Sequence, residues 1–312
     1  MRPLGKGLFW AAVSVLAWGT LFPVGRLLIG EGRIDPVSLG MFRFGIAGAV
    51  MLTCGCAVKG GRPMLPRTGR DWLELGLLGF VGAGLMSLFL FVAQRTVASI
   101  NASMLDALAP LLIFLITIAA GRRFRVVQTA GFLVGFTGCL LVLRVLDGGG
   151  FHIDSLQPGD LRILCGAFCW ALYTVFARGI VKRLGGYRVT AWSVLFGALL
   201  LGGIRLCTQG AVTPQDWNTW GLVIYTALVP SALAFLGWNQ AQKYISLGLL
   251  ALMGYLIPLA SALVAWFLIG ETLTPWQAAG AVIVTGAVLT EPEVAAFCAA
   301  QAAKWKPKRV ES

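Results

Sequence analysis

Charged residues are scarce in this sequence. Only 12% of its 312 residues are Asp, Glu, Lys or Arg, whereas 58% are hydrophobic. Typical soluble domains hold about 25% charged residues. A chain with this balance has too little polar surface to cover a water-soluble globule. The composition therefore predicts a protein that lies in a lipid bilayer and excludes an ordinary soluble domain.

Groups that bind metals or phosphates are also few. The only histidine is His152, and the seven cysteines lack the spacing of zinc ligands. Nearly all of these cysteines fall inside or at the ends of hydrophobic stretches, where Cys behaves as a small apolar residue. The phosphate-binding pattern GxxxxGK[ST] is absent. We therefore expect no metal, no cofactor, no disulfide and no ATP hydrolysis by this chain.

Long hydrophobic runs are abundant instead. A helix of about 20 residues crosses the hydrocarbon core, and only helices or closed barrels satisfy the backbone in lipid. These runs do not alternate in polarity as barrel strands do. They predict an all-α membrane protein with ten transmembrane helices at residues 6–29, 37–58, 72–93, 99–119, 126–143, 161–183, 189–207, 218–240, 247–269 and 275–290.

The basic residues are distributed unevenly between the two sides of the predicted spans. If the amino terminus is cytoplasmic, eighteen of the 25 Lys and Arg residues fall in inner segments and six in outer segments. Because cytoplasmic loops carry the excess of Lys and Arg, both termini are expected in the cytoplasm. The net charge of +12 is thus a consequence of topology, and no nucleic-acid partner is expected.

The chain also contains an internal repeat. The sequence AQRTVA at residues 93–98 is matched by AQKYIS at residues 241–246, and the offset of 148 residues also aligns Pro110 with Pro258. Each half holds five spans. Since five is an odd number, the second copy is expected to be inverted in the membrane relative to the first. Inverted repeats are typical of secondary transporters, whose substrate site lies near the midplane between the repeats.

The domain boundaries follow from this repeat. The first repeat is predicted over residues 6–143, the second over residues 161–290, and a basic cytoplasmic tail over residues 291–312.

The halves resemble a known family. The segment SLGLLALMGYLIPLASALVAWFLIGETLTPWQAAGAVIVTGAVL, residues 246–289, resembles the second EamA repeat of the drug/metabolite transporter superfamily. The first half, with Arg43 in MFRF and Pro110 in ALAPLL, resembles the first repeat. Within the superfamily the chain is most similar to the amino-acid exporter branch. The resemblance implies a central cavity lined by spans 1, 3, 4, 6, 8 and 9, with substrate moved by alternating access.

Ionisable and amide groups within the spans are candidates for function. Asp106 lies about two turns into the fourth span, and Gly254 takes its place in the second half. A buried charge in lipid is costly, so Asp106 should face the bundle interior or water. Asp106 is then a counter-charge for a substrate ammonium group or a proton-coupling site. The alternative is a structural acid that bonds to a neighbouring hydroxyl or pairs with an arginine. Asn101 is a second candidate for substrate binding, although such amides commonly join helices instead. Arg43 is predicted to anchor at the headgroups or to form an ion pair.

Aromatic residues within the spans are predicted to line a site for planar or cationic substrates. Trp18 and Trp170 lead this set, because they are repeat-related and lie near the middle of the first and sixth spans. For any single aromatic residue, ordinary packing is the alternative. The predicted residues are Trp18, Phe22, Trp170, Tyr173, Phe176, Tyr225, Trp238 and Tyr255.

Proline and glycine mark places where the helices bend or cross. Pro110 and Pro258 each remove a backbone hydrogen bond, so they are predicted to act as hinges in bent fourth and ninth helices. Glycines spaced by three or four residues predict close helix crossings. These are Gly76, Gly79, Gly82, Gly84, Gly131, Gly135 and Gly138.

These expectations combine into one leading function: a secondary transporter that exports amino acids, above all aromatic ones, or related small metabolites. It is expected as a multi-pass monomer in the bacterial inner membrane, with the small-molecule substrate and the lipid bilayer as its partners. A lipid flippase and a channel-like permease are the alternatives. An intramembrane enzyme ranks last, because no span carries paired aspartates and the single histidine falls in a loop.

Overall fold

The computed structural model describes residues 3–58, 64–93, 105–122, 126–143, 145–147, 149–151, 159–208, 213–269 and 274–302. These residues fold into helices, apart from a short hairpin of β1 (Leu146–Asp147) and β2 (Gly150–Phe151). The two strands pair antiparallel, with Leu146 opposite Phe151. The prediction of an all-α protein is therefore confirmed for the described residues, with this hairpin as the exception.

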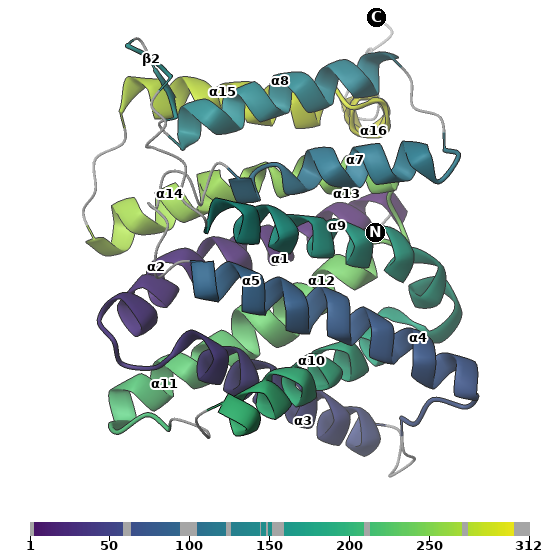
Figure 1. The fold of residues 1–312 in the computed structure, drawn as a ribbon. Coiled ribbons are helices and arrows are strands. Elements are labelled where there is room, and N and C mark those ends of the chain that lie inside the picture. Colours follow the sequence, from purple (N-terminus) through teal and green to yellow (C-terminus); the bar gives the residue numbers. More distant parts are fainter. Residues whose placement is uncertain are drawn as a thin grey trace, which may run out of the picture.

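The first half of the chain forms five successive helical segments (Figure 1). Several are interrupted by short breaks or π-helical turns. The elements are α1 (Pro3–Gly19), α2 (Leu21–Gly25), η1 (Arg26–Gly30), α3 (Pro36–Val58), α4 (Gly69–Gly79), η2 (Phe80–Leu85), α5 (Met86–Ala93), α7 (Ala109–Ala119) and α8 (Val126–Val142).

The second half repeats this plan and ends in one further helix. Its elements are α9 (Asp160–Leu184), α10 (Gly186–Thr208), α11 (Trp217–Thr226), η3 (Ala227–Leu233), α12 (Ala234–Ala241), α13 (Leu247–Gly254), α14 (Leu256–Ile269), α15 (Pro275–Leu289) and α16 (Pro292–Ala302).

Among the described residues, seven of these helical runs are long and apolar enough to cross a membrane. The helices α7 and α8 are apolar but shorter, and α15 meets α16 at a bend of 79°. The predicted fourth span over residues 99–119 begins outside the described residues, so only its α7 portion is seen. The chain is a multi-pass helical membrane protein.

Polar side chains define where several helices begin. Thr68 and Asp71 form a capping box at the start of α4, and Thr274 and Gln277 form another at the start of α15. Asp216 accepts a hydrogen bond from the backbone N–H of Thr219 at the start of α11. Each cap satisfies a backbone donor that the first turn of a helix leaves free.

Helix packing follows the internal repeat. The helix α1 packs against α12 and α14, and α9 packs against α5 and α7, which are the corresponding elements of the other half. The pairs α3 with α10 and α8 with α15 each join one element to its own repeat partner. Exchanging the two halves therefore leaves the main packing contacts unchanged.

The distribution of Lys and Arg assigns each helix end to one side of the membrane. Helix ends that are assigned to the same side lie close together in the structure. On the predicted cytoplasmic side, Arg183 forms ion pairs with Asp71 and Glu74. On the predicted outer side, Arg205 lies 3.5 Å from Asp35. The start of α1 and the helix α16 also lie at the same end of the bundle (Figure 1).

The third segment of each half contains a π-helix. η2 spans Phe80–Leu85 and η3 spans Ala227–Leu233, which places their starting residues 147 apart, close to the offset of the sequence repeat. In η3, Pro230 has no N–H to donate. The hydroxyl of Ser231 donates instead to the carbonyl oxygen of Thr226 at 2.8 Å. π-Helical turns are frequent at functional sites.

Most of the predicted glycine crossings are present. A Cβ atom at Gly84 would lie 2.5 Å from the Leu200 side chain, and one at Gly138 would lie 2.9 Å from the backbone nitrogen of Val284. Gly79, Gly82 and Gly135 are similarly close to a neighbouring helix, whereas Gly131 makes only ordinary contacts. The prediction for Gly76 is wrong, because no neighbouring helix approaches it. Its spacing from Gly79 does not by itself place it on the packed face.

Candidate functional site

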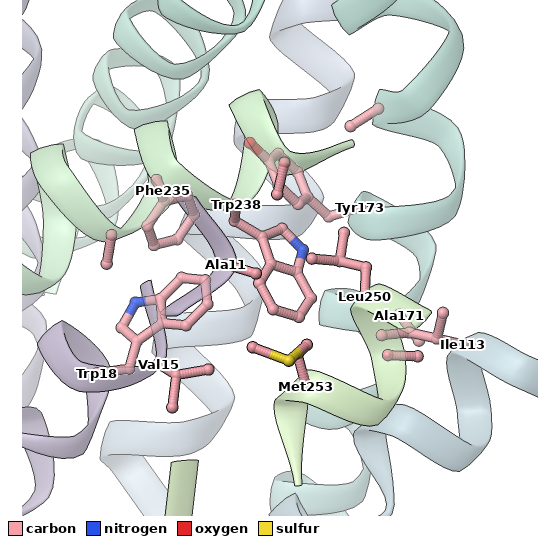
Figure 2. Close-up of a cluster of buried hydrophobic side chains, with 14 of the residues drawn as sticks. Ala11, Val15, Trp18, Ile113, Ala171, Tyr173, Phe235, Trp238, Leu250 and Met253 are labelled. Carbon is pink, nitrogen blue, oxygen red and sulfur yellow. The ribbon is translucent and has the colours of Figure 1, made fainter. Parts of the chain in front are cut away.

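Aromatic residues from three helices meet in the bundle centre, and Figure 2 shows Trp18, Tyr173, Phe235 and Trp238 among them. We call them the aromatic cluster: Trp18 of α1, Trp170 and Tyr173 of α9, and Phe235 and Trp238 of α12. The Trp18 ring centroid lies 5.0 Å from Trp170, 5.6 Å from Phe235 and 5.3 Å from Trp238, in edge-to-face arrangements. Trp170 stacks on Tyr173 with centroids 5.3 Å apart. The cluster thus joins the two halves of the chain.

Hydrogen bonds fix two of its tryptophans. The indole Nε1 of Trp18 donates to the carbonyl oxygen of Pro230 at 2.9 Å. The indole Nε1 of Trp238 donates to Thr174 Oγ1 at 3.1 Å. A buried indole N–H normally requires such an acceptor. These bonds orient both rings and tie α1 to η3 and α12 to α9.

Tyr173 is held by a buried amide. Asn239 donates from Nδ2 to the Tyr173 hydroxyl at 2.6 Å and to Thr190 Oγ1 at 2.9 Å. Asn239 therefore connects α12 with α9 and α10, as expected for an amide that joins helices. In this conformation the Tyr173 hydroxyl is engaged within the protein, and its ring supplies the surface that faces Trp170.

Two other predicted residues lie apart from the aromatic cluster. Tyr225 donates a hydrogen bond to Thr20 Oγ1 at 2.7 Å and packs in a separate group with Val24 and Val223. Phe176, three residues after Tyr173 on α9, is 60% exposed and so is not part of the buried aromatic cluster.

Asp106 and Tyr255 belong to a second polar group. Asp106 is half-buried, and no hydrogen bond or ion pair joins it to the chain within the described residues. It interacts electrostatically with Cys139 of α8, which in turn interacts with Tyr255. The Tyr255 hydroxyl is buried and, among the described residues, has no hydrogen-bond partner. A carboxylate and a phenol thus each interact electrostatically with the same thiol.

Breaks in two helices bring this group close to the aromatic cluster. The helix α7 begins at Ala109, immediately before Pro110, and the break between α13 and α14 lies at Tyr255, shortly before Pro258. A Cβ atom at Gly254 would lie 3.2 Å from Pro110 Cγ and 3.8 Å from the Trp238 ring. The interrupted segments of both halves therefore meet beside Trp238, which agrees with the prediction of bent helices.

Two predicted site residues cannot be placed. Asn101 lies outside the described residues, and for Phe22 only the helical backbone of α2 is described. Phe235, in contrast, was missed by the sequence analysis although its ring contacts Trp18, Trp170 and Tyr173. Its position three residues before Trp238 places both on one face of a helix, and this spacing was the available indication. No group of His, Cys, Asp and Glu suited to a metal ion occurs in the part of the chain that the structure describes.

Comparison with known proteins assigns the family. The model of the EamA-like transporter family matches residues 5–144 and 157–290. The chain belongs to this family. The match falls in two stretches, one in each half of this EamA protein.

Relatives of this EamA protein are transporters by name. It is 29% identical over 291 residues to the uncharacterized transporter YyaM of Bacillus subtilis, with 92% of this chain and 91% of the relative covered. It is 28% identical to a probable amino-acid metabolite efflux pump of Salmonella typhimurium, with 89% and 92% covered. It is 26% identical to a probable terminal-alkyne amino-acid exporter of Streptantibioticus cattleyicolor, with 89% and 90% covered.

A solved structure shares the fold. One crystal structure with 24% sequence identity superposes with a TM-score of 0.77 and covers 93% of this chain and 98% of its own. Other relatives include inner-membrane transporters of Salmonella typhimurium and Escherichia coli. This EamA protein is therefore a multi-pass transporter of the inner membrane.

Proposed function

We propose that this EamA protein is a secondary exporter of amino acids, with aromatic amino acids as the leading substrates. The observation that carries the proposal is the aromatic cluster, which offers Trp18, Trp170 and Phe235 as ring surfaces where the two halves meet. Edge-to-face and stacked contacts favour planar ligands. Two relatives carry amino-acid export or efflux in their names. We propose that the substrate class of this EamA protein is that of the aromatic amino acid exporter YddG.

We further propose ten transmembrane helices arranged as two inverted five-helix repeats, over residues 6–143 and 161–290, with both termini in the cytoplasm. The paired packing contacts, the two π-helices and the same-side ion pairs support this arrangement. Export would then proceed by rocking of the repeats around a central site. The breaks at Pro110 and Pro258 supply the hinges, because each proline prevents a continuous helix there.

The remaining predicted residues take different roles in this proposal. Asp106 supplies a negative charge for a substrate ammonium group or for a coupled proton, since intramembrane carboxylates of this kind mark ion and substrate pathways. The Tyr255 hydroxyl, which has no hydrogen-bond partner among the described residues, is proposed as a further polar contact for the substrate. Tyr225 and Asn101 are proposed as further substrate contacts. The protein works as a monomer.

Transport in proteoliposomes tests the proposal. Vesicles containing the purified protein and vesicles without protein are loaded with labelled tryptophan or phenylalanine, and loss of label is followed with time. We expect protein-dependent efflux of both amino acids, strongly reduced by Trp18→Ala. The matched variant Trp217→Ala, whose side chain is 89% exposed, should export normally. Efflux of a labelled phospholipid instead of either amino acid would identify a lipid flippase.

A further inference from the structure

Arg43 is a buried cation in the middle of the bundle. Its side chain, on α3, is only 2% exposed. The guanidinium stays protonated in proteins, and moving such a charge into a bilayer costs several kcal/mol. The prediction that Arg43 anchors at the headgroups is wrong, because an anchoring side chain would reach the surface.

The neighbours of Arg43 do not neutralise its charge. Its Nε donates to Ser231 Oγ at 2.8 Å, and its Cζ lies 4.6 Å from the Phe44 ring and 5.4 Å from the Phe91 ring. Within the described residues, no carboxylate pairs with it, and nothing accepts a hydrogen bond from its terminal nitrogens Nη1 and Nη2. The prediction of an ion pair is therefore also wrong. Arg205, the buried arginine of α10, does have an acidic partner in Asp35.

Arg43 and the aromatic cluster meet at the same π-helix. Trp18 binds the carbonyl oxygen of Pro230, and Arg43 binds the side chain of the next residue, Ser231. The ring of Phe44, adjacent to Arg43 in α3, lies 5.7 Å from the ring of Phe235. The guanidinium and the aromatic cluster are thus both bonded to η3, at adjacent residues. Movement of η3 would affect both.

We propose that Arg43 binds the carboxylate of the transported substrate. A guanidinium offers two parallel N–H donors that fit the two oxygens of a carboxylate, and Nη1 and Nη2 are the donors left unused by the protein. The carboxylate supplies the missing negative charge, while the neighbouring rings receive the apolar part of the same molecule. This inference rests on the proposed function for the identity of the substrate, but the anion site itself is open to a separate test.

Binding of two matched probes tests the site without transport. The probes are 3-phenylpropionate and its neutral amide, 3-phenylpropionamide, titrated calorimetrically into the full-length protein in nanodiscs. We expect the carboxylate to bind roughly ten- to a hundredfold more tightly than the amide, as for a hydrogen bond to a charged group. Arg43→Gln should abolish this difference, and Arg43→Lys should retain part of it because a point charge remains. Arg205→Gln, the matched control, should keep the full difference.

Several outcomes overturn the proposal. Equal binding of the two probes by the wild-type protein does so even if Arg43→Gln fails to fold. A full carboxylate preference in folded Arg43→Gln does so as well. Titrations in chloride and in sulfate buffers test whether the site binds an inorganic anion instead. The proposal is wrong if chloride or sulfate binds in an Arg43-dependent manner while 3-phenylpropionate does not bind.

Failure of the site and failure of the proposed function are distinguishable. If the carboxylate preference depends on Arg43 but labelled tryptophan is not exported, the site stands and the substrate assignment fails. If tryptophan is exported equally by the wild-type protein and by folded Arg43→Gln, export stands and the carboxylate site fails.

Discussion

Trp18 in α1 donates a hydrogen bond of 2.9 Å from its indole Nε1 to the backbone carbonyl oxygen of Pro230, 212 residues further along the chain. This bond joins α1 of the first half to the π-helix η3 of the second. It also gives a partner to a carbonyl inside η3, where the helical hydrogen-bond pattern is interrupted by proline. The aromatic cluster is therefore part of the joint between the halves, and a second role as a surface for ligands is our proposal.

Replacing Trp18 by Phe should separate these two roles. Phe keeps a ring for packing but removes the N–H, which leaves the buried Pro230 oxygen without its donor. An unsatisfied buried group costs about 1 to 3 kcal/mol, so we expect a lower free energy of unfolding, measured by thermal unfolding in nanodiscs. Trp217→Phe is the control, because that indole is 89% exposed. Equal stability of the two variants would show that the bond contributes nothing.

The hydroxyl of Ser231 should be equally important for η3. Ser231→Ala removes both the donor to the Thr226 oxygen and the acceptor for the Arg43 Nε. We expect a loss of about 1 to 3 kcal/mol for the groups left unpaired, measured by thermal unfolding. Ser87→Ala is a matched control, since the Ser87 hydroxyl is buried but has no partner among the described residues. That variant should lose little, and a loss as large as that of Ser231→Ala would contradict the expectation.

The general plan of the fold was predictable because hydrophobic length and repeated residues determine it. Most runs that predicted spans contain described helices, although the run at residues 99–119 begins outside the described residues. Trp18 and Trp170, paired from the repeat, contact each other with centroids 5.0 Å apart. The helix interruption near Pro258 follows from the missing N–H of proline. These features depend on local chemistry and on the spacing of residues along the chain.

Other features depend on three-dimensional packing, which spacing alone does not determine. The π-helix η2 could not be predicted from the sequence. It contains no proline, and a shift of one residue in the hydrogen-bond pattern leaves the hydropathy of the segment unchanged. A phenylalanine such as Phe235 is common in apolar runs, so only the arrangement of three helices shows that it joins the cluster. Arg43 was interpreted from its position near the end of a span, whereas its burial comes from the approach of η3 to α3.

The crossing of α8 and α15 should be intolerant of added volume. A Cβ atom at Gly280 would lie 2.5 Å from the Gly138 carbonyl oxygen and 2.8 Å from the Leu141 side chain. Gly280→Ala should therefore force the helices apart and lower stability by about 1 to 3 kcal/mol. Gly286→Ala, in the same helix but with no neighbour within 4 Å, is the control and should be neutral or slightly stabilising. The melting temperatures of the two variants, measured by thermal unfolding, test this expectation. Similar melting temperatures would refute this account of the crossing.

The cap of α11 should make part of the stability depend on pH. Asp216 accepts hydrogen bonds from the Thr219 hydroxyl at 2.6 Å and from its backbone N–H at 2.8 Å, and these bonds hold the pKa of the Asp216 carboxyl below its ordinary value. A group whose pKa is lower in the folded state stabilises above its unfolded pKa, and this contribution is lost as pH falls through the folded pKa. Melting temperatures measured from neutral to acidic pH should show a drop that is smaller in Asp216→Asn. Parallel curves for the two proteins would exclude this role.

Asp106 should influence export through its charge. Because no hydrogen bond or ion pair ties it to the described part of the chain, Asp106→Asn is expected to preserve folding while removing the negative charge beside Cys139 and Tyr255. We expect efflux of labelled phenylalanine to fall roughly tenfold, the effect of losing about 1.4 kcal/mol of binding, and its dependence on an imposed pH gradient to weaken. Asp216→Asn, at the helix cap outside the spans, is the control and should export normally. If Asp106→Asn keeps both the substrate affinity and the pH dependence, Asp106 is a structural acid. The second half then has Gly254 at the matching position for reasons of packing, not of transport.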